Sequence, residues 1–151
     1  PTPSRPHPTT LLFLFNRDSP HMLRAWLDHH VSVLGDARAL HVVDHASEDL
    51  ETRALLDEAR AMGVQVTTYH GPFSGKQDAL SAVMRARAPQ AHLLVPLDVD
   101  EFVGVYRRGS YSFRRQDVLG ELARLGPTVG QGKRYKFGVA DARPCDARAC
   151  L

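Results

Sequence analysis

The sequence predicts an α/β fold built on a mainly parallel β-sheet with helices on both faces. Four short apolar runs alternate with three segments whose apolar residues recur at helical spacing, so the order is β-α-β-α-β-α-β. The first run, residues 11–15, is continuously apolar, as expected of a strand that is covered on both faces. The second and third helical segments end at Gly63 and Pro89, two residues that commonly terminate helices.

The start of the chain is expected to lie outside the folded domain. Residues 1–8 hold four prolines, which disfavour a helix or a central strand, so we expect a proline-rich arm or linker. One domain then spans 9–151. Residues 9–15 form its first strand, and Ser19 and Pro20 suit the N-cap and the first position of the helix that follows.

The remaining elements continue the same alternation. They are a strand at 39–44, a helix at 50–63, a strand at 64–70, a helix at 76–88 and a strand at 91–102. After residue 102 the pattern is less regular, with a short helix near 116–125 and a possible strand at 132–138. The chain opens without Met, and we expect it to be a piece of a longer protein.

Composition argues against several classes of function. The net charge of +2 is too small to indicate nucleic-acid or membrane binding, and the aromatic residues are not interleaved with basic ones. The apolar run at 11–15 is far shorter than the roughly 18 residues of a membrane span. Cys145 and Cys150 lack the further ligands of a structural zinc site. We expect no nucleic-acid partner and no membrane segment, and both the cytoplasm and the Golgi lumen stay open as locations.

Three carboxylates follow the fourth apolar run, at the point where a buried strand should end. In an extended strand Asp98 and Asp100 point to the same side, roughly 6 to 7 Å apart, while Val99 points into the packing and Glu101 to the other face. Two carboxylates on one side suit a hard cation such as Mg²⁺ or Mn²⁺, which keeps water and phosphate oxygens as its other ligands. The pattern therefore predicts a divalent-metal site.

Four segments of the chain share their pattern and order with one protein family. They are "FNRDSPHMLRAWLDHHVSVLG", "VVDHASED", "LDVDEF" and a later "YKFG". Together they resemble the nucleotide-sugar-dependent glycosyltransferases of the Rossmann-like GT-A fold, especially the family 2-like and family 92-like groups. The likeness covers residues 10 to about 138. A GT-A domain is normally longer than this chain, so the resemblance also implies a domain that is incomplete at its C-terminus.

The resemblance implies roles for residues at the strand ends. Asn16 and Asp44 would contact the nucleoside part of a donor such as a UDP-sugar. Asp98 and Asp100 match the family's Asp-X-Asp motif and would hold Mn²⁺ or Mg²⁺ on the diphosphate. The second acid of that motif is commonly the direct ligand, so Asp100 is the expected ligand and Asp98 the ribose or outer-sphere partner.

The third predicted helix begins with two further candidates. Lys76 and Gln77 lie at its N-terminus, where a helix favours anions, and they would help to hold the donor; the alternative is a solvated helix start. In the first helix, Trp26 is expected to pack on the sheet. Of the adjacent His29 and His30, at most one shares that face, and metal ligation by them is not expected.

The chain departs from the family pattern at three positions. Arg17 replaces an acid, and could pair with a phosphate or form an ion pair with Asp18 or Asp44. His45 stands where Asn is common. Ala46 stands where the turn often has Gly, which predicts a less strained turn.

The reaction that the resemblance implies is sugar transfer from a nucleotide-diphosphate donor to a hydroxyl of a glycan or other acceptor. The general base, and with it every catalytic residue, stays unknown, with Glu101 and Asp141 as candidates. One alternative is a truncated or non-catalytic module that binds a nucleotide sugar. A second is a haloacid-dehalogenase-type phosphatase, whose motif has Thr or Val where this chain has Phe102.

Overall fold

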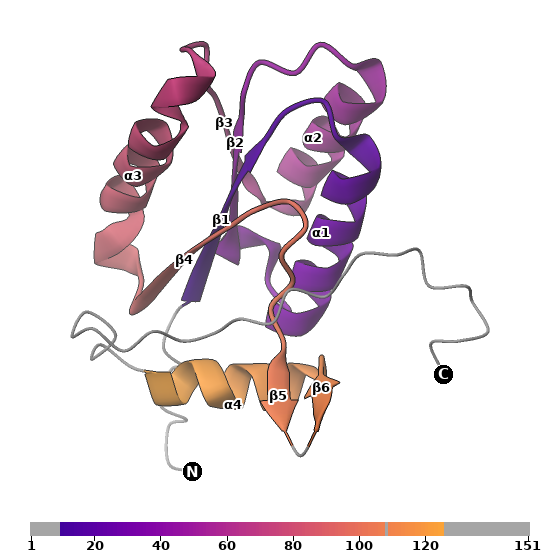
Figure 1. Cartoon of the computed structure of the whole chain (residues 1–151), viewed down its shortest axis with the longest axis vertical. Coiled ribbons are helices and arrows are strands. Elements are labelled where there is room, and N and C mark those ends of the chain that lie inside the picture. Colours follow the sequence, from indigo (N-terminus) through magenta and orange to yellow (C-terminus); the bar gives the residue numbers. More distant parts are fainter. Residues whose placement is uncertain (1–9, 108, 126–151) are drawn as a thin grey trace.

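The computed structural model describes residues 10–107 and 109–125 (Figure 1). Its strands are β1 (Thr10–Asn16), β2 (Leu40–Asp44), β3 (Gln65–Thr68), β4 (Leu93–Leu97), β5 (Val105–Arg107) and β6 (Ser110–Ser112). Its helices are α1 (Pro20–Leu34), α2 (Leu50–Met62), α3 (Lys76–Arg87) and α4 (Arg115–Leu125), with short 3-10 turns at Ala37–Ala39, Phe73–Gly75 and Ala88–Gln90. The arm expected at 1–8 and the strand expected at 132–138 lie outside the described residues.

The predicted parallel sheet is confirmed for its four strands. Their order is β3-β2-β1-β4, and each neighbouring pair is parallel. All seven residues of β1 are buried because it lies between β2 and β4 and is covered on both faces, which explains its continuously apolar sequence. Asn16 pairs with Asp44, and Asp44 with Thr68, so β1, β2 and β3 end at the same level.

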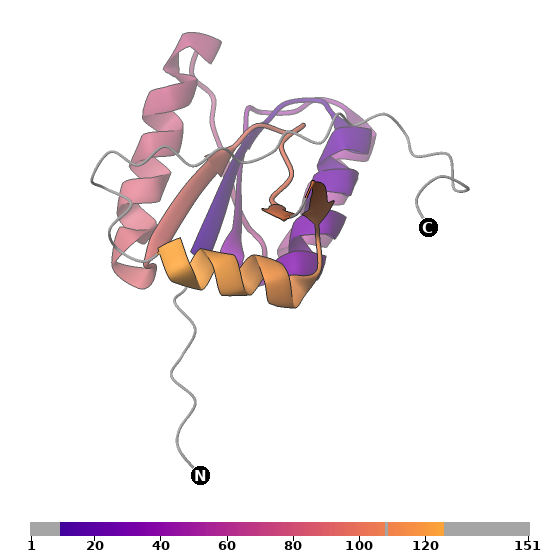
Figure 2. The same cartoon turned by 60° about the horizontal axis from the view of Figure 1, so that its bottom comes forward.

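Helices cover both faces of the sheet, as the sequence predicts. Helices α1 and α2 lie on one face and α3 on the other (Figures 1 and 2). Gly35 and Gly63 end α1 and α2 in the left-handed conformation, and the side chain of Asp49 caps the start of α2. Ser19 is the N-cap residue of α1 as expected, but its hydroxyl donates to the carbonyl of Arg17 instead of capping the helix.

The two faces of the sheet are packed unequally. On the α1 side, Trp26 and His30 are fully buried and His29 is half-buried, which confirms that one of the two histidines shares the packed face. On the opposite face, α3 has no fully buried residue. Its apolar stripe is where the sequence predicts it but is only half-buried, at Ala79, Leu80, Val83 and Met84. The α3 side is therefore the looser layer.

The chain beyond the sheet forms a two-stranded ribbon and one helix. Strands β5 and β6 pair antiparallel, and α4, predicted near 116–125, follows them. Helix α4 lies near the end of the sheet at which β1 begins, and it buries Val118, Leu122 and Leu125 (Figures 1 and 2). Within the described ranges, no helix has both the length and the apolar character needed to cross a bilayer.

Two buried histidines should make the stability of this fold depend on pH. Burial lowers the pKa of His30 to about 3 and that of His41 to about 4, from an ordinary value near 6.5. Below pH 6.5 the unfolded chain therefore binds protons that the folded chain does not. The free energy of unfolding decreases as the pH is lowered. We expect the free energy of unfolding at pH 5 to be lower than at pH 7 by about 2 kcal/mol per histidine.

Urea denaturation at the two pH values measures this difference. Replacing His41 by Gln should remove about half of it, since Gln does not titrate and its amide can still reach the Thr67 hydroxyl that His41 Nε2 meets at 2.9 Å. Equal free energies of unfolding at pH 5 and pH 7 in the unmodified chain would contradict the prediction.

Candidate functional site

The carboxyl ends of the four parallel strands meet at one edge of the sheet, where α/β proteins bind their ligands. All the sequence-predicted donor-binding residues lie at this edge, in two contact groups. Asn16 and Asp44 contact each other at the ends of β1 and β2. Lys76 and Gln77, at the start of α3, line a pocket together with Asp98, which follows β4.

Asp44 is buried, and its carboxylate is held within its own turn. The Ser47 amide donates to Oδ2 over 2.9 Å and the Ser47 hydroxyl to Oδ1 over 2.6 Å, while Asn16 Nδ2 approaches Oδ1 to 3.4 Å. Asn16 is also buried, and its Oδ1 has no hydrogen-bond partner among the described residues. Leaving a buried acceptor unpaired costs about 1–3 kcal/mol, so this oxygen is a candidate contact for a ligand.

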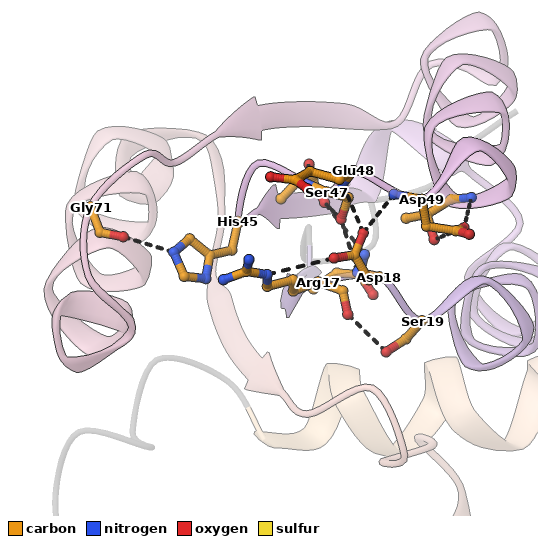
Figure 3. Close-up of polar contacts among 11 residues, drawn as sticks. Arg17, Asp18, Ser19, His45, Ser47, Glu48, Asp49 and Gly71 are labelled. Atoms are coloured by element: carbon orange, nitrogen blue, oxygen red, sulfur yellow. Dashed lines mark hydrogen bonds and ion pairs between the residues drawn. The ribbon is translucent and has the colours of Figure 1, made fainter.

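Asp18 joins the loop after β1 to the loop after β2 (Figure 3). Its Oδ1 accepts the amides of Glu48 at 2.8 Å and Asp49 at 2.9 Å, and its own amide donates to the Ser47 hydroxyl. The hydrogen bond from the Asp49 amide is the main cause that lowers the pKa of Asp18. Of the alternatives for Arg17, the structure has the exposed ion pair with Asp18, at 3.6 Å.

Sequence reasoning did not find this junction. It identified Asp18 only as a possible partner of Arg17 and gave no role to Ser47. The Asp18 carboxylate meets amides that lie 30 and 31 residues further along the chain, and no local pattern indicates such a contact. An acid directly before an N-cap Ser and a Pro is the one signal that could have drawn attention to it.

The expectation of a less strained turn at Ala46 is wrong. Ala46 has a φ of +46°, in the left-handed region that costs an L-residue about 1–2 kcal/mol, and its amide donates to the Asp44 carbonyl. The turn needs this conformation because it must bring Ser47 back to the Asp44 carboxylate. The neighbouring His45 donates from Nε2 to the Gly71 carbonyl at 2.7 Å, which ties the turn to the loop after β3 (Figure 3).

Aromatic rings fill the α3 side of the edge. The Phe15 ring has three ring neighbours, with centroids 5.5 to 6.1 Å away, in His45, Tyr69 and Phe73. Lys76 Nζ lies 5.7 Å from the Phe15 centroid, within the range of a cation–π contact. The Nζ of Lys76 also lies 6.0 Å from the Phe73 centroid, so its ammonium group lies beside two of these rings.

Lys76 and Asp98 form an ion pair at this end of α3. The ammonium Nζ donates to Asp98 Oδ1 over 2.7 Å. A pocket of about 450 Å³ opens between α3 and the end of β4, lined by Lys76, Gln77, Asp98 and Glu101 with apolar residues of α3 behind them. Three of the predicted donor-binding residues thus share one pocket.

The prediction that Asp98 and Asp100 extend from one face of a strand is wrong. Strand β4 ends at Leu97, where its pairing with β1 stops, and the next four residues form a turn. The Glu101 amide donates to the Asp98 carbonyl at 3.0 Å, and the Glu101 carboxylate accepts the Asp98 amide at 2.8 Å. These two hydrogen bonds close the turn, so strand alternation does not govern the carboxylates. Val99 packs against the core as expected.

The two carboxylates differ in the partners that they have in the structure. Asp100 is exposed and forms no hydrogen bond or ion pair with any described residue, and Asp98 Oδ2 is likewise unpaired there. Within the described ranges, no three His, Cys, Asp or Glu side chains gather as metal ligands. The divalent-metal site at Asp98 and Asp100 stays a prediction from the sequence, in which water and a diphosphate would supply the other ligands.

Comparisons with protein-family models, curated proteins and solved structures give no significant match for this chain. The class that the fold defines is an α/β domain in which a four-stranded parallel sheet is flanked by helices. The glycosyltransferase resemblance stays a prediction from the sequence.

The strained turn gives a test of the geometry at Asp44. Replacing Ala46 by Gly should raise the free energy of unfolding by up to about 1 kcal/mol, because glycine adopts a φ of +46° without the penalty of a Cβ. Ala54, exposed in the interior of α2, provides the matched control, since Ala54→Gly should lower the free energy of unfolding by about 0.5–1 kcal/mol. Chemical denaturation of both variants measures the contrast, and a loss of stability in both would contradict the turn geometry.

Proposed function

We propose that this chain is the donor-binding part of a divalent-metal-dependent glycosyltransferase. Such an enzyme moves a sugar from a nucleotide-diphosphate donor to an acceptor hydroxyl, and a UDP-sugar is the favoured donor. The observation that carries the proposal is the 2.7 Å contact between Lys76 Nζ and Asp98 Oδ1, with the open carboxylate of Asp100 two residues on. The positively charged Lys76, which suits a phosphate, and the carboxylates of Asp98 and Asp100, which suit a cation, lie at the edge of a parallel sheet where such proteins bind ligands.

The two acids have different proposed roles at the diphosphate. Asp100 is the direct ligand of the cation, and Asp98 contacts the ribose or a water in the outer sphere. When bound, a divalent cation offsets the charge that develops on the leaving diphosphate. Asn16 and Asp44 are the proposed nucleoside contacts. The unpaired Oδ1 of Asn16 supports this role, because it can accept a hydrogen bond from a base or ribose.

Lys76 changes partner in this proposal. Without donor, its ammonium neutralises Asp98 and rests near the Phe15 ring. A diphosphate carries more negative charge than one carboxylate, so it competes for the ammonium, and Asp98 is then released toward the cation and the ribose. Gln77 lines the same pocket and supplies an uncharged donor to the phosphate oxygens.

A non-catalytic module that binds the same donor is the second candidate, and the state of Glu101 favours it. The Glu101 carboxylate accepts the Asp98 amide and so closes the turn, which occupies one oxygen of this candidate base. The other candidate, Asp141, lies outside the described residues. The phosphatase alternative gains no support, since Phe102 packs its ring parallel to that of His30 instead of offering a hydroxyl or small side chain.

Isothermal titration of UDP in the presence of Mn²⁺ tests the metal assignment. We expect Asp100→Asn to weaken UDP binding by about ten-fold or more, because the amide keeps the shape of the side chain but loses the charge that a hard cation requires. With a chelator in place of Mn²⁺, variant and unmodified chain should bind UDP equally. Unchanged Mn²⁺-dependent binding in Asp100→Asn would refute the assignment.

Asp28, an exposed aspartate of α1, gives the matched control, and Asp28→Asn should bind UDP like the unmodified chain. Titrations of UDP-glucose, UDP-galactose and GDP-mannose then rank the donors. Release of UDP from the preferred donor in the presence of Mn²⁺ and an acceptor favours the enzyme, whereas Mn²⁺-dependent binding without release favours the module.

Lys76 tests the proposed change of partner, because its removal should have two opposite effects. Lys76→Met should weaken Mn²⁺-dependent UDP binding by about ten-fold through the loss of a charged hydrogen bond to phosphate. The same variant should bind Mn²⁺ alone more tightly than the unmodified chain, since Asp98 is no longer neutralised. Lys76→Arg, which keeps the charge, should change both affinities much less. Equal Mn²⁺ affinities in Lys76→Met and the unmodified chain would contradict the exchange.

A further inference from the structure

Two adjacent histidines of α1 form hydrogen bonds with the backbone of a single residue, one with the carbonyl and one with the amide of Val103. His29 Nε2 lies 2.9 Å from the Val103 carbonyl oxygen, and the Val103 amide donates to His30 Nε2 over 3.2 Å. These contacts join positions more than 70 residues apart in the chain. We call this arrangement, formed by His29, His30 and Val103, the histidine clamp.

The contacts require the two rings to be in opposite tautomers. A carbonyl oxygen only accepts, so His29 carries its proton on Nε2 and donates to Val103. The His30 ring must instead accept at Nε2, so it carries its proton on Nδ1, which lies 2.8 Å from the carbonyl of Trp26. The lowered pKa of His30, about 3 because of burial, agrees with a neutral ring that keeps this acceptor.

The clamp holds the chain immediately after the acidic turn. Two internal hydrogen bonds close the turn from Asp98 to Glu101. Strand β4 fixes the position of the start of this turn, at Asp98, but not of its end, at Glu101. At its second end, the Phe102 ring packs edge-on to His29 at 5.2 Å and parallel to His30 at 5.9 Å, and the buried Val103 follows. The histidines are therefore the polar contacts that fix where the turn leaves the sheet.

We propose that His29 and His30 are positioning residues that hold the Asp98–Glu101 turn in place for the phosphate groups of a nucleotide and its cation. The inference rests on the proposed function for its ligand, while the clamp itself rests only on the contacts with Val103. Neither histidine touches the ligand. They act by keeping the turn, and with it the exposed Asp100 carboxylate, in one place relative to Lys76, which pairs with Asp98 at the start of the turn.

A pair of variants at His29 tests the clamp. His29→Phe keeps a ring against Phe102 and Phe113 but removes the donor to Val103, whereas His29→Gln restores an N–H donor. Amide hydrogen exchange over residues 98–104, followed by mass spectrometry, should be faster in His29→Phe and near the unmodified rate in His29→Gln. UDP affinity with Mn²⁺ should fall about five-fold in His29→Phe and recover in His29→Gln. His21→Phe, an exposed histidine in the first turn of α1, is the matched control.

The outcomes separate this inference from the proposed function. Unchanged exchange over 98–104 in His29→Phe would overturn the clamp, and faster exchange with unchanged UDP affinity would overturn its positioning role. An unmodified chain that binds no nucleotide with Mn²⁺ would overturn the proposed function, while the exchange rates still decide whether the clamp holds the turn. Rescue of both readouts by Gln supports the inference, because a loss of packing alone would not be restored by an amide.

Discussion

The parallel pairing of β1 with both of its neighbours is the constraint on which the rest of the structure depends. Asn16 is paired with Asp44 of β2, and Leu14 with Leu97 of β4. Since parallel strands end at one edge, this register brings three loops together that are distant along the chain. The apolar character of β1 therefore has a consequence beyond the core: it determines which polar residues meet.

Four carboxylates lie near that edge, and three of them have hydrogen-bond or ion-pair partners within the protein. Ser47 holds Asp44, the backbone amides of the next loop hold Asp18, and Lys76 pairs with Asp98. Asp100 alone among these four acids has no partner within the described residues. Three of these acids thus have partners within the protein, and Asp100 differs from them.

Helix α1 connects the core to the candidate site. Its Trp26 is buried on the sheet, and the Trp26 carbonyl orients the His30 ring that meets Val103. The packing of one helix thereby reaches the backbone next to the acidic turn. The other face differs, because α3 covers the sheet loosely and leaves a pocket of about 450 Å³ beside Lys76. The α1 and α2 side of the sheet is therefore the more fully buried layer, and the α3 side is the more exposed one.

Much of the fold could be read from local patterns. Burial repeats every 2 residues in strands and every 3.6 in helices, so the order of elements, the helix stop at Gly63 and the helix start at Lys76 follow from the sequence alone. The candidate edge was also predictable in part, since Asn16, Asp44 and Asp98 directly end or follow apolar runs, and parallel strands must deliver them to one side.

Contacts between distant residues decided the rest. Whether a strand continues depends on a neighbour to pair with, and β4 loses its pairing at Leu97, so the acids form a turn where the pattern predicted a strand. The opposite tautomers of the two histidines likewise depend on a partner elsewhere in the chain, the backbone of Val103. Periodicity reports which side of an element is buried, but the hydrogen bonds that shape a turn are determined only when the elements meet.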